Sequence, residues 1–337
     1  MTVGMSKPSA VNAEVISVEF TKRLKRSLFH LYEIAELNHG ADKKSFILDS
    51  IKKISGKESF LWLICAINRR LIELYERDCL GAFYWAKLIE VITDKSSKDV
   101  LIEPGQFSRF ECHLFLRYSF ETGSYPITHV DTLTPSQKSL AQTVVNEAMS
   151  LAEIHVPDIY GEIKNYVTNI LVFNSDKIIS GSTFSLAKCI YFRAPVDSSM
   201  NSVLEVLDLI THEVAHMHLH LLSIKDPLVL NDPEELFLSP FRKDNRPMIG
   251  IFHAHFVLYR LLILLTTPSL YENFKCIRSH YEKRIQTYLE RIEFSKEIVQ
   301  KHAKLTDLGK SMFDETLSYI KDLQNVPTRT YKEVVQR

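Results

Sequence analysis

The segment from Val203 to Leu222, VLEVLDLITHEVAHMHLHLL, constrains the fold of this chain more than any other. Its apolar residues recur at helical spacing, and it carries four of the chain's 13 histidines. The pattern predicts a helix that begins at Ser202, where Ser202 and Glu205 would form a capping box, and that ends near Leu222. The sequence therefore places several imidazole side chains on one long helix.

Five residues of this segment, HEVAH, match the pattern HExxH. At about 100° and 1.5 Å of rise per residue, His212 and His216 lie one turn apart on one face, where two imidazoles can reach a single divalent ion. Glu213 is rotated by one residue step, toward a metal-bound water or ligand. An isolated HExxH can also arise by chance on a partly buried helix. We interpret His220 as a packed core histidine rather than a residue supporting the ligands, and His218, on the opposite face, as having no role.

A third ligand is required, because open transition-metal sites generally use three protein ligands. The sequence GIFHAHF supplies two candidates, His253 and His255. In a helix they would sit roughly 200° apart, so only one of them can face the metal. They belong to the apolar segment from Met248 to Leu265, which predicts a buried helix and not a membrane span, because its most apolar run is short and carries Arg260.

The rest of the chain predicts an α+β, mainly helical protein. Residues 1–125 form a helical N-terminal region and residues 126–337 an HExxH metal-binding catalytic domain. Further predicted elements are a helical stretch from Glu14 to Leu116, a linker from Glu121 to Gln137 ending in a Thr134–Gln137 capping box, strands within YVTNILVFNS and FSLAKCIYFRA, an ordered loop or short turns from Asp226 to Pro247, and helices from Ser269 to Gln324.

The order of strand, HExxH helix, loop and later histidine resembles a zincin-like core with a small sheet. In that arrangement the strand before the metal helix, Phe184 to Ala194, runs along the edge of the cleft, where an extended peptide can add as a further strand. The resemblance therefore implies a peptide substrate. The triplet HVD at His129 to Asp131 also matches an oxygenase motif, but three residues are weak evidence and we assign them to the linker.

Composition excludes several other classes of function. The 41 basic and 41 acidic residues balance, so no overall charge favours nucleic acid or an anionic membrane. The N-terminal residues lack the apolar core of a signal peptide. The five cysteines have neither CxxC spacing nor an even number, which argues against a disulfide framework and favours a reducing cytoplasm: Cys65, Cys79, Cys112, Cys189 and Cys276.

The loop before the second helix carries a more specific pattern. The stretch from Ser239 to Leu262, SPFRKDNRPMIGIFHAHFVLYRLL, together with the HExxH helix, resembles the HExxH-type peptide β-hydroxylases, which are 2-oxoglutarate-dependent enzymes of ribosomal peptide pathways. The matching pieces are Ser-Pro-x-Arg, Asn-Arg-Pro and Gly-x-x-His, with Asn245 where the family more often has aspartate. The resemblance extends from about Ile170 to Leu265 and says little about residues 1–125.

The resemblance implies an Fe(II)- and 2-oxoglutarate-dependent dioxygenase that hydroxylates a side-chain carbon, Cβ, of a precursor peptide. It selects His253, rather than His255, to complete the ligand set with His212 and His216. Either Arg242 or Arg246 would bind the distal carboxylate of 2-oxoglutarate, because a guanidinium donates paired hydrogen bonds better than an ammonium does. These arginines could instead pair with nearby acidic residues at the surface.

Two alternatives remain open. A zincin-type zinc metallopeptidase would use the same HExxH, with Glu213 as general base on a metal-bound water. Against it, Leu219 stands where the pattern HExxHxxGxxH requires glycine. A non-catalytic peptide-binding or scaffold protein would hold a structural metal in a closed site of four ligands, which would recruit His220 or His255.

Overall fold

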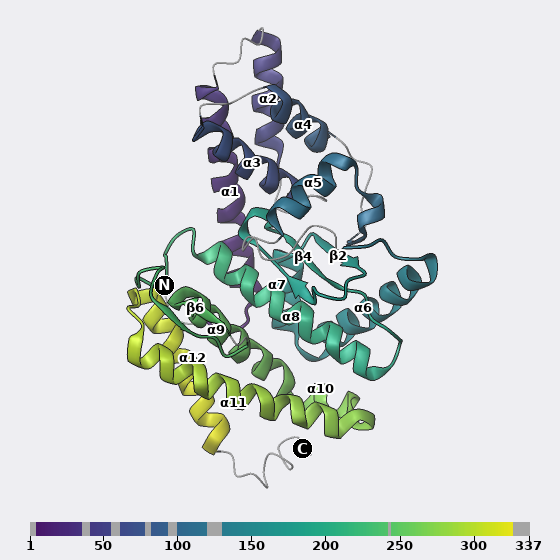
Figure 1. Cartoon of the computed structure of the whole chain (residues 1–337), viewed down its shortest axis with the longest axis vertical. Coiled ribbons are helices and arrows are strands. Elements are labelled where there is room, and N and C mark those ends of the chain that lie inside the picture. Colours follow the sequence, from purple (N-terminus) through teal and green to yellow (C-terminus); the bar gives the residue numbers. More distant parts are fainter. Residues whose placement is uncertain are drawn as a thin grey trace. The chain divides into compact units, whose positions relative to one another are not determined.

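The computed structural model describes residues 5–35, 41–54, 61–77, 82–93, 100–119, 130–241 and 244–325 (Figure 1). These residues are mainly helical with a small mixed sheet, so the predicted α+β, mainly helical class is confirmed. Two compact units are present. We call residues Met1–Asn12, Leu140–Ile163 and Pro195–Arg337 the α8 unit, and residues Ala13–Ser139 and Lys164–Ala194 the sheet unit. The predicted boundary at residue 125 lies outside the described residues.

The sheet unit begins with the predicted run of helices. Its helices are α1 (Ala10–Ile34, most of which belongs to this unit), α2 (Ala41–Lys53), α3 (Leu61–Tyr75), α4 (Ala82–Thr93) and α5 (Arg109–Tyr118). Short 3-10 helices, η1 (Pro104–Gln106) and η3 (Phe184–Leu186), flank its strands. The prediction of a mainly helical region from Glu14 to Leu116 is therefore confirmed for the described residues.

The sheet of this unit has the order β1-β2-β4-β3 among the described residues. Its strands are β1 (Leu101–Ile102), β2 (Asn169–Phe173), β3 (Ser180–Gly181) and β4 (Cys189–Arg193), with β3 antiparallel to β4 and the other pairs parallel. The two predicted strands are confirmed as β2 and β4. The prediction that the segment Phe184 to Ala194 forms an edge strand is wrong, since β4 pairs on both sides and its first four residues are all buried, as is typical of a central strand.

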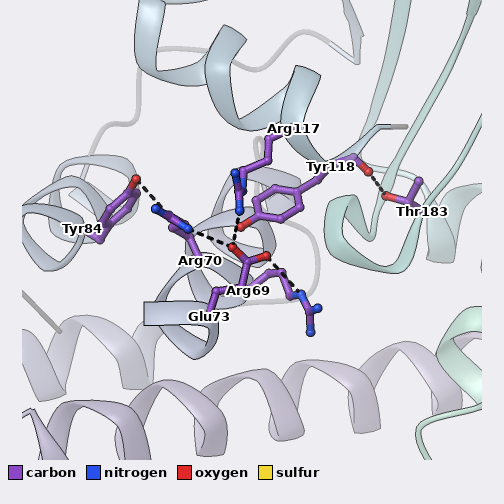
Figure 2. Close-up of polar contacts among 7 residues, drawn as sticks. All are labelled: Arg69, Arg70, Glu73, Tyr84, Arg117, Tyr118 and Thr183. Carbon is purple, nitrogen blue, oxygen red and sulfur yellow. Dashed lines mark hydrogen bonds and ion pairs between the residues drawn. The ribbon is translucent and has the colours of Figure 1, made fainter. Parts of the chain in front are cut away.

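A charged cluster links α3 and α5 within the sheet unit (Figure 2). The carboxylate of Glu73 accepts hydrogen bonds from Arg70 at 3.0 Å and Arg117 at 2.8 Å, and it lies 3.7 Å from Arg69. Burial alone would raise the pKa of Glu73, but the hydrogen bonds from Arg117 and Arg70, together with the charge of Arg117, outweigh it and lower the pKa. Next to this cluster, the Thr183 hydroxyl donates to the Tyr118 carbonyl oxygen at 3.0 Å, joining α5 to the segment before η3.

The α8 unit contains the HExxH helix. Its elements are α8 (Met200–Leu222), the hairpin β5 (Leu236–Leu238) and β6 (Asn245–Pro247), α9 (Met248–Leu265), α10 (Pro268–Asn273), the 3-10 helix η4 (Lys275–Ile277), α11 (Arg278–His302), α12 (Asp307–Asn325), and most of α6 (Pro135–His155) and α7 (Pro157–Tyr166). The helices predicted from Ser269 to Gln324 are thus confirmed. Figure 1 labels the helices α6 to α12 and strand β6, and α9 packs against both α8 and α11.

Two helix starts were predicted from capping boxes, and one of them is correct. Gln137 donates its backbone N–H to the Thr134 hydroxyl at 3.3 Å, and its side chain accepts from the Thr134 N–H at 2.9 Å. Helix α8, however, is capped by Ser199 and not by Ser202. The Ser202 hydroxyl instead donates to Asp197 at 2.6 Å. The cap of the helix therefore lies three residues before the predicted one.

The buried helix α9 confirms the prediction for Met248 to Leu265. By length and composition it could cross a membrane, but 78% of the segment is buried within the protein, as in the core helix of a soluble domain. Its one arginine, Arg260, is also buried and donates to Glu162 at 2.8 Å. The charge that argued against a membrane span therefore has a partner inside the protein.

The segment from Asp226 to Pro247 was predicted as a loop or short turns, and it contains a hairpin. Strand β5 pairs antiparallel with β6, and the Ser239 N–H donates to the Asp244 carbonyl oxygen at 3.1 Å between them. The Ser239 hydroxyl also accepts from the Phe241 N–H at 3.3 Å. Proline did not prevent the pairing because Pro247 stands at the end of an edge strand, where a missing N–H is tolerated.

Candidate metal centre

Helix α8 presents a row of polar side chains at intervals of one turn: Asp208, His212, His216 and His220. The ring centroids of His212 and His216 are 5.0 Å apart, and those of His216 and His220 are 6.3 Å apart. All three histidines are partly exposed, whereas Glu213 is buried. The HExxH spacing thus places its two imidazoles side by side on an accessible face, as helical geometry requires.

Helix α9 adds a fourth histidine to this face. The ring of His253 lies 5.6 Å from that of His216 and 5.3 Å from that of His220, and the Nδ1 atoms of His253 and His216 are 3.4 Å apart. Two nitrogens that each lie 2.0–2.1 Å from one tetrahedral ion are about 3.4 Å apart. The spacing between His216 and His253 is therefore of the size that a shared metal ion requires. We call these four residues, His212, His216, His220 and His253, the histidine cluster.

His255 occupies a different environment two residues further along α9. Its side chain is buried, with Nδ1 2.9 Å from the Ser295 hydroxyl and Nε2 2.8 Å from the Thr316 hydroxyl. Burial, followed by the charge of Lys296, lowers the pKa of His255 to about 3. Both ring nitrogens have protein partners, so of the two candidates that spacing left open only His253 lies beside the HExxH histidines.

The other two histidines of α8, His218 and His220, lie in different environments. His218 is buried, stacks on Phe256 with ring centroids 5.5 Å apart, and has its Nδ1 atom 3.8 Å from the Glu162 carboxylate. It lies away from the cluster, as its helical position predicted. His220 was interpreted as a packed core histidine, and this was wrong, because it is partly exposed and contacts two members of the cluster.

Burial and neighbouring histidines both affect the protonation of His253. The pKa of His253 is lowered well below its usual value, first by burial and then by the charges that His220 and His216 would carry. The neutral imidazole that results is the form that ligates a metal. Among the described residues, no three histidine, cysteine, aspartate or glutamate side chains are yet arranged to hold a metal ion. The cluster therefore supplies suitable donors without a completed coordination geometry.

The two arginines predicted to bind 2-oxoglutarate are not both placed by the structure. Arg246, on β6, forms an ion pair with Asp244 at 2.7 Å, which is one of the surface pairings that the sequence allowed. Arg242 lies outside the described residues. As it stands, the Arg246 guanidinium has an acidic partner on its own hairpin.

Three features of the site were not anticipated from the sequence. The ring of Phe241, in the hairpin loop, meets the ring of His212 edge to face at 5.4 Å, and the guanidinium of Arg291 lies over Phe241, 5.4 Å from its centroid. Phe241 is the unspecified residue of the Ser-Pro-x-Arg motif, so its position was visible but its role was not. Arg291 lies 75 residues beyond the end of HExxH, and no local motif marks it.

The third feature is the buried carboxylate of Asp208, one turn before His212. It accepts hydrogen bonds from Arg284 and from Tyr288, the latter at 2.5 Å, and both donors lie on α11. Burial raises the pKa of Asp208 more than these two partners lower it. This contact fixes α8 against α11 beside the histidine cluster. Its spacing of four residues from His212 is a signal that the sequence could have supplied.

Comparison with known proteins adds no assignment to this geometry: no protein-family model matches the chain, and no curated protein is significantly similar to it. The functional argument therefore rests on the histidine cluster, on its surroundings and on the motifs that the sequence displays.

Proposed function

We propose that the protein is an Fe(II)- and 2-oxoglutarate-dependent hydroxylase that modifies a side-chain carbon, Cβ, of a ribosomally made precursor peptide. One observation carries the proposal: a histidine from a second helix, His253, stands 3.4 Å from the HExxH residue His216. The Ser-Pro-x-Arg, Asn-Arg-Pro and Gly-x-x-His motifs between the two helices support it, because together they are more specific than HExxH alone.

In this proposal His212, His216 and His253 hold the iron. Histidine rings turn by rotation about their two side-chain torsions, so rings that already lie in contact can direct their nitrogens to a common point when an ion binds. When bound, iron and 2-oxoglutarate supply the activation of O2. The zincin-like arrangement of a small sheet, an HExxH helix and a later histidine is part of the same proposal.

The surrounding residues prepare the site. Phe241 covers one side of His212 and reduces its contact with water, and the Asp208 contacts keep α8 in place next to α11. Glu213 is buried within the same turn of helix as His212, where it would orient a ligand or a water molecule. The protein thereby positions the target C–H bond and limits side reactions, while the iron and its cosubstrate carry the oxidation itself.

We further propose a cytoplasmic location, without nucleic-acid or membrane partners. The most apolar helix, α9, is largely buried, which is typical of a soluble core. The cysteines that the structure describes are all free: Cys65, Cys112, Cys189 and Cys276. Free thiols and the need for reduced iron both suit a reducing compartment.

A zinc metallopeptidase is the second candidate, because a donor set made of imidazoles suits zinc as well as iron. In that case Glu213 would act as general base on a metal-bound water. The closeness of His220 to His253 also suits a closed, structural site with four ligands. The hydroxylase requires O2 and 2-oxoglutarate, whereas the two alternatives require neither. An experiment that supplies or withholds these molecules can therefore distinguish them.

The deciding experiment begins with anaerobic purification and elemental analysis of the bound metal. The protein is then incubated with Fe(II), 2-oxoglutarate, air and the precursor peptide encoded nearest to its gene. A hydroxylase adds the mass of one oxygen atom to the intact peptide and forms succinate. Peptide fragments that also form without O2 and 2-oxoglutarate, and that disappear in Glu213→Gln, would establish the peptidase instead.

A further inference from the structure

The face of α11 that meets α8 carries Arg284, Tyr288 and Arg291, at positions i, i+4 and i+7. The first two both bind the buried carboxylate of Asp208, so this face is directed at the polar side of α8. Arg284 is thereby neutralised. Arg291 continues the same row by one turn, toward the part of α8 that carries the histidine cluster.

Arg291 differs from the other arginines near the cluster in its partners. Among the described residues it has no hydrogen bond or ion pair, and its guanidinium lies over the ring of Phe241, 5.4 Å from the ring centroid. Arg246, by comparison, pairs with Asp244, and Arg260 pairs with Glu162. Arg291 is partly exposed, so its guanidinium is accessible to a ligand.

The position of this guanidinium over the Phe241 ring also bears on its role. A guanidinium that lies over an aromatic ring keeps its N–H groups in its own plane, so that one edge stays open to a planar anion. The same Phe241 ring meets His212 at 5.4 Å, which places the cation one side chain away from a proposed iron ligand. Phe241 therefore has a cation on one side and a metal-ligating imidazole on another.

We propose that Arg291 binds the distal carboxylate of 2-oxoglutarate and is the residue that selects a dicarboxylic 2-oxo acid. This inference rests on the proposed function. It places the residue that binds the distal carboxylate on α11 and not on the hairpin, where Arg246 already has an acidic partner. Arg291 would donate two parallel hydrogen bonds to the carboxylate, while Phe241 holds the guanidinium in position.

The test compares two ligands of equal carbon length, 2-oxoglutarate and 2-oxopentanoate, which lacks the distal carboxylate. Both are titrated calorimetrically, without O2, into the full-length protein loaded with Fe(II). The variants are Arg291→Gln, Arg291→Lys and, as a matched control, Arg278→Gln. Arg278 is a partly exposed arginine of the same helix that pairs with Glu282. Metal content and melting temperature are measured for every variant, so that loss of fold is detected separately.

The wild type should bind 2-oxoglutarate roughly 10- to 100-fold more tightly than 2-oxopentanoate, the difference that a charged hydrogen-bonded pair contributes. Arg291→Gln should reduce this preference to less than about threefold and leave 2-oxopentanoate binding and metal content unchanged, with Arg291→Lys in between and Arg278→Gln at the wild-type value. If Arg291→Gln keeps the preference, or weakens only peptide binding, Arg291 is not the carboxylate partner and the hydroxylase proposal stands. If the iron-loaded wild type binds neither acid, the proposed function itself fails.

Discussion

The Glu73 cluster of the sheet unit and the histidine cluster of the α8 unit are both polar groups carried by helices, and they differ in charge balance. In the first, donors from Arg70 and Arg117 converge on one carboxylate, and their attraction lowers its pKa (Figure 2). In the second, like groups are collected, and the pKa of His253 is lowered first by burial and then by His220 and His216. A cluster that joins opposite charges stabilises its own fold, whereas a collection of like groups persists only because other contacts hold its helices together. We therefore expect substitutions in the first to affect stability and substitutions in the second to affect ligand binding.

The largest expected effect is loss of metal binding. His212→Ala, His216→Ala and His253→Ala should each abolish stoichiometric Fe(II) retention after anaerobic loading and desalting, because each removes one of three ligands. His255→Gln should retain the metal, since His255 is bonded to Ser295 and Thr316 instead. Elemental analysis gives the metal content. Retention in His253→Ala with loss in His255→Gln would reverse the choice of third ligand.

The corresponding change in the sheet unit is Glu73→Gln. We expect it to lower the free energy of unfolding by about 2–3 kcal/mol, because it leaves two guanidinium groups without their carboxylate. The lowered pKa of Glu73 means that its contribution is present at neutral pH and is lost as the pH falls through the folded-state pKa, below the usual value of 4.5. Urea unfolding at pH 7 and at pH 4 measures both effects.

The matched control within that cluster is Arg69→Gln. Arg69 is about half exposed and lies 3.7 Å from Glu73, so its removal should cost less than about 1 kcal/mol. Iron binding should be unchanged in both variants. A loss of iron in Glu73→Gln at a temperature where the protein stays folded would contradict the separation between the two clusters.

A third, smaller effect concerns pH and His255. Its folded-state pKa of about 3 lies below the usual 6.5, so between these values the unfolded state binds a proton that the folded state does not. Stability should therefore fall on acidification below pH 6.5, with a contribution from His255 of up to about 1.4 kcal/mol per pH unit. His255→Gln should flatten the dependence measured by urea unfolding at pH 7, 6 and 5. An identical slope in the variant would show that His255 is protonated in the folded protein.

The smallest expected effect is that of Arg246→Lys. Because Arg246 pairs with Asp244 at the surface of the hairpin, the change should alter the affinity for 2-oxoglutarate by less than about threefold and the stability by less than about 1 kcal/mol. Calorimetric titration beside Arg291→Gln makes the comparison direct. A loss of affinity greater than that in Arg291→Gln would indicate that Arg246, which the motifs first suggested, binds the distal carboxylate of 2-oxoglutarate.

Periodicity in the sequence was sufficient for the helices and for the two longer strands. Apolar residues repeat at helical spacing in α8, α9 is a nearly continuous apolar run, and β-branched and aromatic residues gather in β2 and β4, so local propensity and tertiary packing agree there. The hairpin β5–β6 was missed because its strands have three residues each, too few for an alternating pattern. The sheet position of β4 was misassigned because strand order depends on pairing between distant segments.

For the candidate site, the sequence by itself determined the row His212, His216 and His220, since the α-helix fixes the position of every fourth residue. It also limited the third metal ligand to His253 or His255, whose side chains point to different faces of one helix. Only the tertiary structure decided what faces each of these residues: Ser295 and Thr316 enclose His255, Phe241 covers His212, and Arg291 reaches the same place from a helix far along the chain. Such contacts join residues that no local spacing relates, because they are set by how α8, α9 and α11 pack against one another.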